Sequence, residues 1–285
     1  MLLGPALEYL EIRPDGIYVD ATFGAGGHSS AILARLTTGR LISFDADPTA
    51  IARAAAITDP RFTFVSANFR ELTDELDRCG VASIDGILFD LGVSSMQFDD
   101  PERGFSLGKA APLDMRIDPR QGRSAYDVLA TASESELADI FFHYGEERAA
   151  RRLAHAVVGR RLAGSLPETT TDFAALVSGV VHRSGHRERI HPATRVFQAL
   201  RIAVNEELDA LRDGLDAAIL RLRATGRVVA ISFHSLEDRI VKQTFRGDER
   251  LTVLTKKPLG PSEAEIAANP RSRSSKLRAA QRKAS

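Results

Sequence analysis

The feature that most constrains the fold of this 285-residue chain is an apolar run near the N-terminus that ends in glycines. Residues 17–23 are apolar and β-branched enough to form a buried strand, and residues 24–27 read Gly-Ala-Gly-Gly. The periodic apolar run at 31–36 then predicts a helix. A strand, a glycine-rich turn and a helix in this order present bare backbone N–H groups to a nucleotide. The sequence therefore predicts an α/β sheet with a nucleotide site at this turn.

The residues around the turn indicate which nucleotide binds. Asp45 follows a second predicted strand (40–44), at the separation from the glycines where an acid holds a ribose hydroxyl. The dinucleotide fingerprint needs a third glycine where Ser29 stands. Asp20, just before the turn, can accept a hydrogen bond from an ammonium group, which favours S-adenosylmethionine because that molecule carries an amino acid tail and no pyrophosphate. A glycine turn in an α/β protein without a nucleotide remains the alternative.

The composition excludes several classes of protein. The 38 Lys and Arg residues together balance the 38 Asp and Glu residues, so no global basic field points to nucleic acid. A local basic patch would still suffice to bind one. The single cysteine, Cys79, excludes an internal disulfide and a cysteine-based zinc site. No apolar run reaches the length of a membrane span, and the N-terminus has no secretory pattern. We expect a soluble cytoplasmic protein with no membrane partner and no metal site.

Two further strands end at candidate site residues. The predicted strand 61–65 leads to Phe69, which is either an adenine contact or a core side chain. The predicted strand 84–89 ends at Asp90, across the topological switch point from the first strand, where open α/β sheets place their chemistry. Asp90 can accept a hydrogen bond from a substrate amine, or it can cap the segment that follows.

The strand pattern stops after Asp90 and returns only at 227–233, which indicates an insertion. A long loop rich in Gly, Pro and charge is followed by helical patterns alone. We divide the chain into a first part of the sheet domain (1–98), an inserted helical substrate-recognition domain (99–205) and a second part of the sheet domain with a basic tail (206–285).

Helix caps and basic stretches give further expectations. Ser133 with Glu136, and Ser235 with Asp238, are predicted to begin two helices as N-caps. The predicted helix 146–161 has a basic face that either meets RNA phosphates or is simply solvated. Its members are Arg148, Arg151, Arg152, Arg160 and Arg161. The tail carries a second basic cluster suited to RNA phosphates, Arg271 to Arg278, and is also where an antiparallel seventh strand is expected.

Eight collinear motifs resemble the bacterial small-subunit rRNA methyltransferase H family, also called MraW. They stand at 19–29, 87–95, 99–106, 112–116, 144–147, 191–195, 231–239 and 269–273. The resemblance implies a Rossmann-like, class I S-adenosylmethionine-dependent methyltransferase sheet with an inserted all-helical domain. It also implies methylation of the exocyclic amine (N4) of a cytidine in the decoding region of 16S rRNA, within the small ribosomal subunit. It leaves a homodimer open.

The resemblance also implies site residues. For the implied reaction, our own hypothesis is that Asp90, with or without a backbone carbonyl near Leu91, accepts the N–H bonds of the target amine, and that Phe98 or Phe105 stacks on the base. The implied cofactor contacts are Gly26, Gly27, His28, Asp45, Phe69, Asp90 and Gln97.

Two other classes of protein stay open. The first is an NAD-dependent oxidoreductase, which the misplaced third glycine argues against. The second is a ribosome assembly factor without catalysis, which the intact Gly26, Asp45 and Asp90 argue against.

Overall fold

The computed structural model of the protein describes residues 1–181 and 191–284. The chain forms two compact units: unit 1 comprises Met1–Gly92 and Leu208–Ser285, and unit 2 comprises Val93–Glu207. The predicted boundaries lay after residues 98 and 205. The first division falls earlier than predicted because the short helix α5 (Ser95–Asp99) packs against the 3-10 helix η2 (Pro101–Arg103) inside unit 2.

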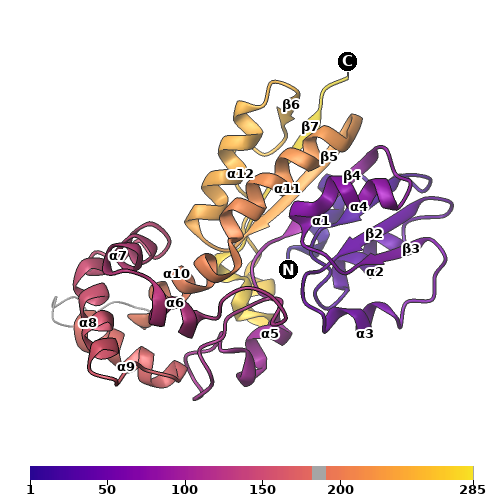
Figure 1. The fold of residues 1–285 in the computed structure, drawn as a ribbon. Coiled ribbons are helices and arrows are strands. Elements are labelled where there is room, and N and C mark those ends of the chain that lie inside the picture. The colour runs from indigo at the N-terminus through magenta and orange to yellow at the C-terminus, as the bar shows by residue number, and fades with distance from the viewer. Residues whose placement is uncertain (182–190, 285) are drawn as a thin grey trace. The chain divides into compact units, whose positions relative to one another are not determined.

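Unit 1 contains a seven-stranded sheet in the order β3-β2-β1-β4-β5-β7-β6. The strands from β3 to β5 pair in parallel, and β7 pairs antiparallel with both of its neighbours. In Figure 1 the indigo N-terminal strands and the orange and yellow C-terminal strands belong to one sheet. The strands are β1 (Ile17–Asp20), β2 (Arg40–Phe44), β3 (Phe62–Val65), β4 (Ile84–Asp90), β5 (Leu222–Ser232), β6 (Leu251–Val253) and β7 (Lys276–Arg282). The Rossmann-like α/β fold predicted from the sequence is thereby confirmed.

The strands form where the sequence is nearly continuously apolar, as it must be in a parallel sheet covered on both faces. β4 is buried along its length except at its last residue, Asp90. The helices of unit 1 are α1 (Leu3–Leu10), α2 (Gly27–Leu33), α3 (Ala50–Ala54), α4 (Leu72–Arg78), α11 (Glu207–Arg221), α12 (Ser235–Gly247) and α13 (Glu263–Ala268), with the 3-10 helices η1 (Phe69–Glu71) and η4 (Pro270–Ser274). Helix α1 contacts β4, β5 and α2, which brings the start of the chain next to the glycine turn.

The predicted cap of α12 is wrong by one residue. The N-cap is His234 and not Ser235, and the third residue of the helix is Glu237. Glu237 is buried, and its Oε2 accepts hydrogen bonds from the backbone N–H groups of Phe233 (2.7 Å) and His234 (3.3 Å). A histidine ring nitrogen thus takes the place of the hydroxyl that capping usually employs.

The basic tail forms the antiparallel strand β7, and this changes the role of one of its arginines. Arg278 is buried, and its guanidinium donates to both carboxylate oxygens of Asp238 on α12, at 2.6 and 3.1 Å. It is therefore a structural residue and not a contact for RNA phosphates, whereas Arg273 is exposed.

Unit 2 is built from helices around a core of its own. Its helices are α5, α6 (Ala125–Thr131), α7 (Glu134–His143), α8 (Ala150–Leu162), α9 (Thr170–Val181) and α10 (Ala193–Asn205). Side chains from α6 to α10 pack together, among them Leu137, Phe141 and Phe197. Ser133 forms the predicted capping box with Glu136. The described part of unit 2 holds no strand, as an all-helical insert requires.

Phe105 lies in this core at 7 % exposure, so it is not the aromatic that stacks on a base. Phe98 is 38 % exposed and remains a candidate.

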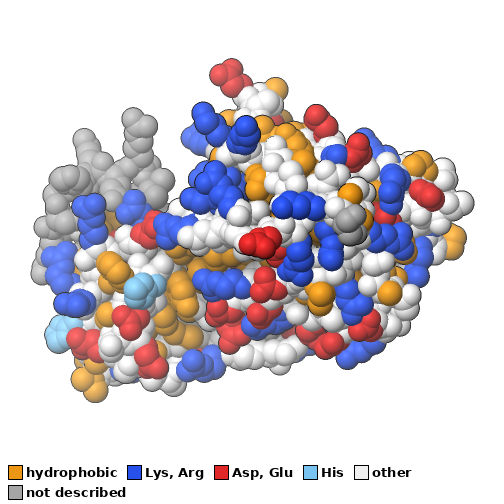
Figure 2. Space-filling view, turned by 90° about the horizontal axis from the view of Figure 1, so that it is seen from above, with side chains coloured by type: hydrophobic (Ala, Val, Ile, Leu, Met, Phe, Trp, Pro, Cys, Tyr) orange, Lys and Arg blue, Asp and Glu red, His pale blue; other side chains and the backbone are white. Residues whose placement is uncertain are grey.

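The surface carries both signs of charge. Figure 2 shows Lys, Arg, Asp and Glu side chains interspersed over the face drawn, in keeping with the balanced composition. Among the residues that the structure describes, no helix combines the length and the apolar character needed to cross a membrane.

Candidate cofactor and catalytic site

The glycine turn after β1 has a backbone shape that requires glycine. Gly24 and Gly26 have φ values of +52° and +81°, in the left-handed region. A Cβ atom on Gly26 would lie 3.0 Å from the Phe23 ring, and Gly27 begins α2 with open space where a Cβ would stand. The turn therefore presents bare backbone at the start of α2, in the strand, turn and helix order that the sequence predicts, and a ligand at this turn stays a prediction.

Asp45 stands beside this turn, at the end of β2. Its Oδ2 accepts from the Gly24 N–H at 2.8 Å, and its Oδ1 accepts from the Asp47 N–H at 2.9 Å. Burial raises the pKa of the Asp45 carboxyl above its ordinary value, although these two N–H groups oppose the shift. The carboxylate holds the glycine turn against β2, and it is partly exposed where the predicted ribose contact would be.

Asp20 has a different role from the one suggested by the sequence. Its side chain is fully buried, and its oxygens accept from the Thr22 N–H (3.1 Å) and the Ser29 hydroxyl (2.6 Å). The Ser29 oxygen lies 2.8 Å from that of Ser43 on β2. Burial is the main cause that raises the pKa of Asp20 to about 6. Asp20 ties β1, the turn and α2 together, and it is not accessible to an ammonium group.

Asp90, by contrast, keeps one carboxylate oxygen free. Its backbone N–H donates to the Thr22 hydroxyl at 2.7 Å, which fixes the end of β4 against the segment after β1. Its Oδ2 lies 3.4 Å from Nδ1 of His28. Its Oδ1 is buried and has no hydrogen-bond partner among the described residues. A carboxylate oxygen withdrawn from water and left unpaired is costly, so this atom indicates a ligand that donates a hydrogen bond.

His28 lies in the first turn of α2 with 7 % of its surface exposed. Its Nε2 lies 3.0 Å from the carbonyl oxygen of Met1. Burial acts to lower the pKa of the imidazole, but the hydrogen bond to Asp90 and the charges of Asp90 and Asp20 outweigh burial and raise it above its ordinary value. His28 and Asp90, two predicted site residues far apart in sequence, are therefore direct neighbours.

Phe69 and Gln97, the two other predicted contacts, have structural roles as well. The ring of Phe69 packs edge-on against Phe89 with centroids 5.5 Å apart, and the side chain is half-buried. It is thus part of the packing and still has an exposed portion. Gln97 belongs to unit 2, where its Oε1 accepts from the Ser94 N–H at 2.8 Å and caps α5. Its contact with the cofactor stays a prediction.

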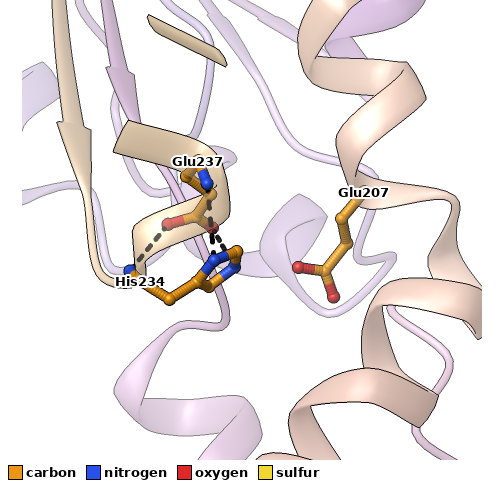
Figure 3. Close-up of side chains that lie close together, drawn as sticks. All are labelled: Glu207, His234 and Glu237. Atoms are coloured by element: carbon orange, nitrogen blue, oxygen red, sulfur yellow. Dashed lines mark hydrogen bonds and ion pairs between the residues drawn. The ribbon is translucent and has the colours of Figure 1, made fainter. Parts of the chain in front are cut away.

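His234 also has a structural place. Figure 3 shows its ring beside Glu237, within the capping box that begins α12. Its Nε2 lies 3.0 Å from Oε1 of Glu237, so the pair holds the loop after β5. His234 therefore has a structural role at the start of α12.

Sequence reasoning missed the residues that support the site. Thr22 orients Asp90, Ser29 holds Asp20, and the Met1 carbonyl meets His28. Thr22 stands two residues after the end of β1, so the alternation of side chains along a strand does not point to it. The Met1 contact had no signal, because it depends on how α1 packs.

The sheet order, the antiparallel seventh strand, the glycine turn after β1 and the acids at the carboxyl ends of β2 and β4 define a class I methyltransferase. The model of the MraW methylase family matches residues 1–283, and the chain belongs to that family. It is 50% identical to a protein of Thermomicrobium roseum named "Ribosomal RNA small subunit methyltransferase H", over 99% of this chain and 92% of the relative. It is 48% identical to the protein of the same name from Azoarcus sp. (strain BH72), over 99% of this chain and 96% of that relative. The resemblance inferred from the motifs is confirmed.

Proposed function

We propose that this methyltransferase transfers a methyl group from S-adenosylmethionine to the exocyclic N4 amine of a cytidine in the decoding region of 16S rRNA. Family membership and the names of the relatives support the reaction and the rRNA substrate. The observation within this chain that carries the proposal concerns Oδ1 of Asp90 at the carboxyl end of β4, which is buried and has no hydrogen-bond partner among the residues that the structure describes. Such an atom indicates a ligand that donates a hydrogen bond, and the exocyclic amine of cytosine is a donor of this kind.

The residues present fit S-adenosylmethionine. The turn at Gly26 and Gly27 offers bare backbone, and Asp45 offers a partly exposed carboxylate for ribose hydroxyls. His28, Phe69, Asp90 and Gln97 complete the proposed set of contacts. S-adenosylmethionine, when bound, supplies a methyl group already activated by the sulfonium charge.

The role proposed for Asp90 follows from the weakness of its substrate as a nucleophile. The lone pair of the cytosine amine is delocalised into the ring. Oδ1 of Asp90 would accept an N–H bond of this amine, which returns electron density to the nitrogen for in-line attack on the methyl carbon. Most of the acceleration would come from positioning the amine, because effective molarities of oriented reactants are large. The base must leave its stack to reach the buried carboxylate.

The basic helix of unit 2 supports an RNA partner. The predicted helix 146–161 is observed as α8 (Ala150–Leu162), so Arg148 lies in the turn before it. Among the described residues, Arg148 and the α8 residues Arg151, Arg152 and Arg160 are exposed and form no ion pair. Arg161 differs, because it donates to the carbonyl oxygens of residues 129, 130 and 132 at the end of α6. We infer that the four exposed arginines meet phosphates of rRNA within the small subunit, in the cytoplasm where ribosomes are assembled. A homodimer remains an expectation that light scattering decides.

The test uses radiolabelled S-adenosylmethionine, the purified protein and small subunits from cells that lack this methylation. We expect label on the N4 amine of one decoding-region cytidine, located by digestion and mass. Asp90→Asn keeps the shape of the side chain, and we expect it to remove labelling while calorimetry still detects cofactor binding. Tight rRNA binding by the wild type without any label would favour the assembly-factor alternative, and binding of NAD instead would favour the oxidoreductase.

A further inference from the structure

The neighbouring side chains of His28 and Asp90 carry an inference about how the site handles protons. We propose that His28 is a positioning residue that acts through Asp90, and that the two side chains together hold the proton released by the substrate amine. The catalytic part of this inference rests on the proposed function, whereas the pairing of the two side chains does not.

The contacts of His28 determine which of its nitrogens carries a proton. A backbone carbonyl can only accept, so Nε2 of His28 must donate to the Met1 oxygen 3.0 Å away. In the neutral imidazole the other nitrogen then has no hydrogen. Nδ1 therefore turns a lone pair toward Oδ2 of Asp90 at 3.4 Å. Two lone pairs at this distance repel each other, and a proton between them relieves the repulsion.

The second step concerns the charges around the pair. His28 faces Asp20 from β1, Asp90 from β4 and the N-terminal ammonium of Met1. Both oxygens of Asp20 are occupied, by the Thr22 N–H and the Ser29 hydroxyl, so Asp20 acts on His28 through its charge alone. The two carboxylates favour a proton on the pair, and the ammonium and burial disfavour it. The pair is thus arranged to gain and lose one proton without a third partner.

The third step connects this arrangement to methyl transfer. As the N–C bond forms, the S–C bond breaks and its electrons stay on sulfur, which leaves the N4 amine with one proton too many. That proton passes to Oδ1 of Asp90, the atom that has no hydrogen-bond partner within residues 1–181 and 191–284. Rotation of the carboxyl group brings the new O–H toward the lone pair of Nδ1, where the proton is shared until it leaves to solvent with the product.

This proton transfer makes kcat depend on pH. The pair can accept the amine proton only when it does not already hold one. We expect kcat to rise with pH through a single inflection above the ordinary histidine value of about 6.5. Below the inflection, the protonated pair leaves Asp90 already engaged with an imidazolium.

The first experiment tests the pair without catalysis. In protein with ¹⁵N-labelled histidine, NMR titration gives the pKa and the tautomer of His28, assigned by comparison with His28→Asn. We expect Nε2 to carry the proton in the neutral form, and Asp90→Asn to lower the pKa of His28 because a neighbouring negative charge is lost. A neutral form protonated at Nδ1, or a pKa that does not move in Asp90→Asn, would overturn the proposal even if the enzyme methylates rRNA.

The second experiment measures kcat against pH on small subunits. His28→Asn places an amide near the Nδ1 position but cannot titrate, so we expect kcat to fall about ten- to a hundredfold and the acid inflection to disappear. His155→Asn is the matched control, since His155 is an exposed histidine that pairs with Glu134, and it should keep the wild-type profile. An acid inflection that survives in His28→Asn contradicts the proposal. Absence of methyl transfer in the wild type would instead overturn the proposed function and leave the NMR result standing.

Discussion

At the scale of single residues, the site depends on the difference between two aspartates that occupy equivalent places. Asp20 and Asp90 each end a parallel strand, and the sequence alone marks both as candidates. Ser29 and Thr22 donate hydrogen bonds to Asp20, whereas Oδ1 of Asp90 has no hydrogen-bond partner in the described part of the chain. Strand ends are visible in a sequence, but the side chains that satisfy a carboxylate come from other elements, so the functional acid could not be singled out before the structure.

Asp20 should make stability depend on pH. Its pKa is about 6 when folded and lies near the ordinary 3.8 when unfolded, so the native state binds the proton more tightly. The free energy of unfolding should therefore decrease as pH rises from about 4 to about 6. Asp20→Asn keeps the shape of the side chain and the acceptor for the Thr22 N–H.

We expect the free energy of unfolding of Asp20→Asn not to decrease over this pH range. Relative to the wild type, the variant should therefore become more stable by about 1–3 kcal/mol between pH 4 and 7. Urea denaturation across that range measures the difference. A difference between the two proteins that stays constant with pH would show that Asp20 is ionised in both states.

At the scale of helices and strands, prediction succeeded where the signal is local. The continuous apolar runs placed β1 to β4 closely, and Ser133 with Glu136 placed the start of α7. Prediction failed where tertiary contacts decide. The N-cap of α12 is His234 and not the predicted Ser235, because Glu237 is buried against the loop. Arg278 does not belong to the exposed basic cluster, because its position in β7 directs it toward Asp238.

Gly214 of α11 sets the position of the predicted adenine contact. A Cβ on Gly214 would lie 2.6 Å from the Phe69 ring and 3.3 Å from that of Phe89. Gly214→Ala should displace Phe69 and cost about 1–3 kcal/mol through overpacking, partly offset by about 1 kcal/mol of helix propensity. We expect weaker binding of S-adenosylhomocysteine in calorimetry. Gly159→Ala in α8, where the Cβ meets nothing within 4 Å, is the control and should only stabilise. An unchanged affinity of Gly214→Ala for S-adenosylhomocysteine would show that Phe69 does not contact the cofactor.

Arg278 and Arg273 should separate structure from RNA binding within the tail. Among the residues that the structure describes, Arg278→Met leaves Asp238 with Lys276 as its cationic partner, 4.0 Å away, so we expect a loss of about 3–5 kcal/mol in urea denaturation. Arg273→Gln removes an exposed charge and should leave stability unchanged while lowering the salt dependence of rRNA binding by about one ion. If filter binding instead shows that the salt dependence falls in Arg278→Met and not in Arg273→Gln, Arg278 contacts RNA.

At the scale of the whole molecule, one chain builds two cores. The sheet of unit 1 pairs β4 with β5, although the whole of unit 2 separates these strands in the sequence. The core of unit 2, which includes Leu137, Phe141 and Phe197, consists of buried side chains from within 93–207. Each unit therefore has the packed interior that cooperative folding requires.

The two cores predict that cofactor binding stabilises the units unequally. Most of the proposed contacts, His28, Asp45, Phe69 and Asp90 among them, belong to unit 1. A ligand stabilises what it binds by about 2.7 kcal/mol at a hundred times its Kd. With S-adenosylhomocysteine at that excess, hydrogen exchange of amides in β1, β2 and β4 should slow about a hundredfold, and that of amides in α7 and α8 should change far less.

A fragment of residues 93–207 should be helical and unfold cooperatively, because its core needs no residue from unit 1. Equal slowing in both units, together with an unfolded fragment, would mean that the molecule folds as one cooperative body and that its two cores are stable only together.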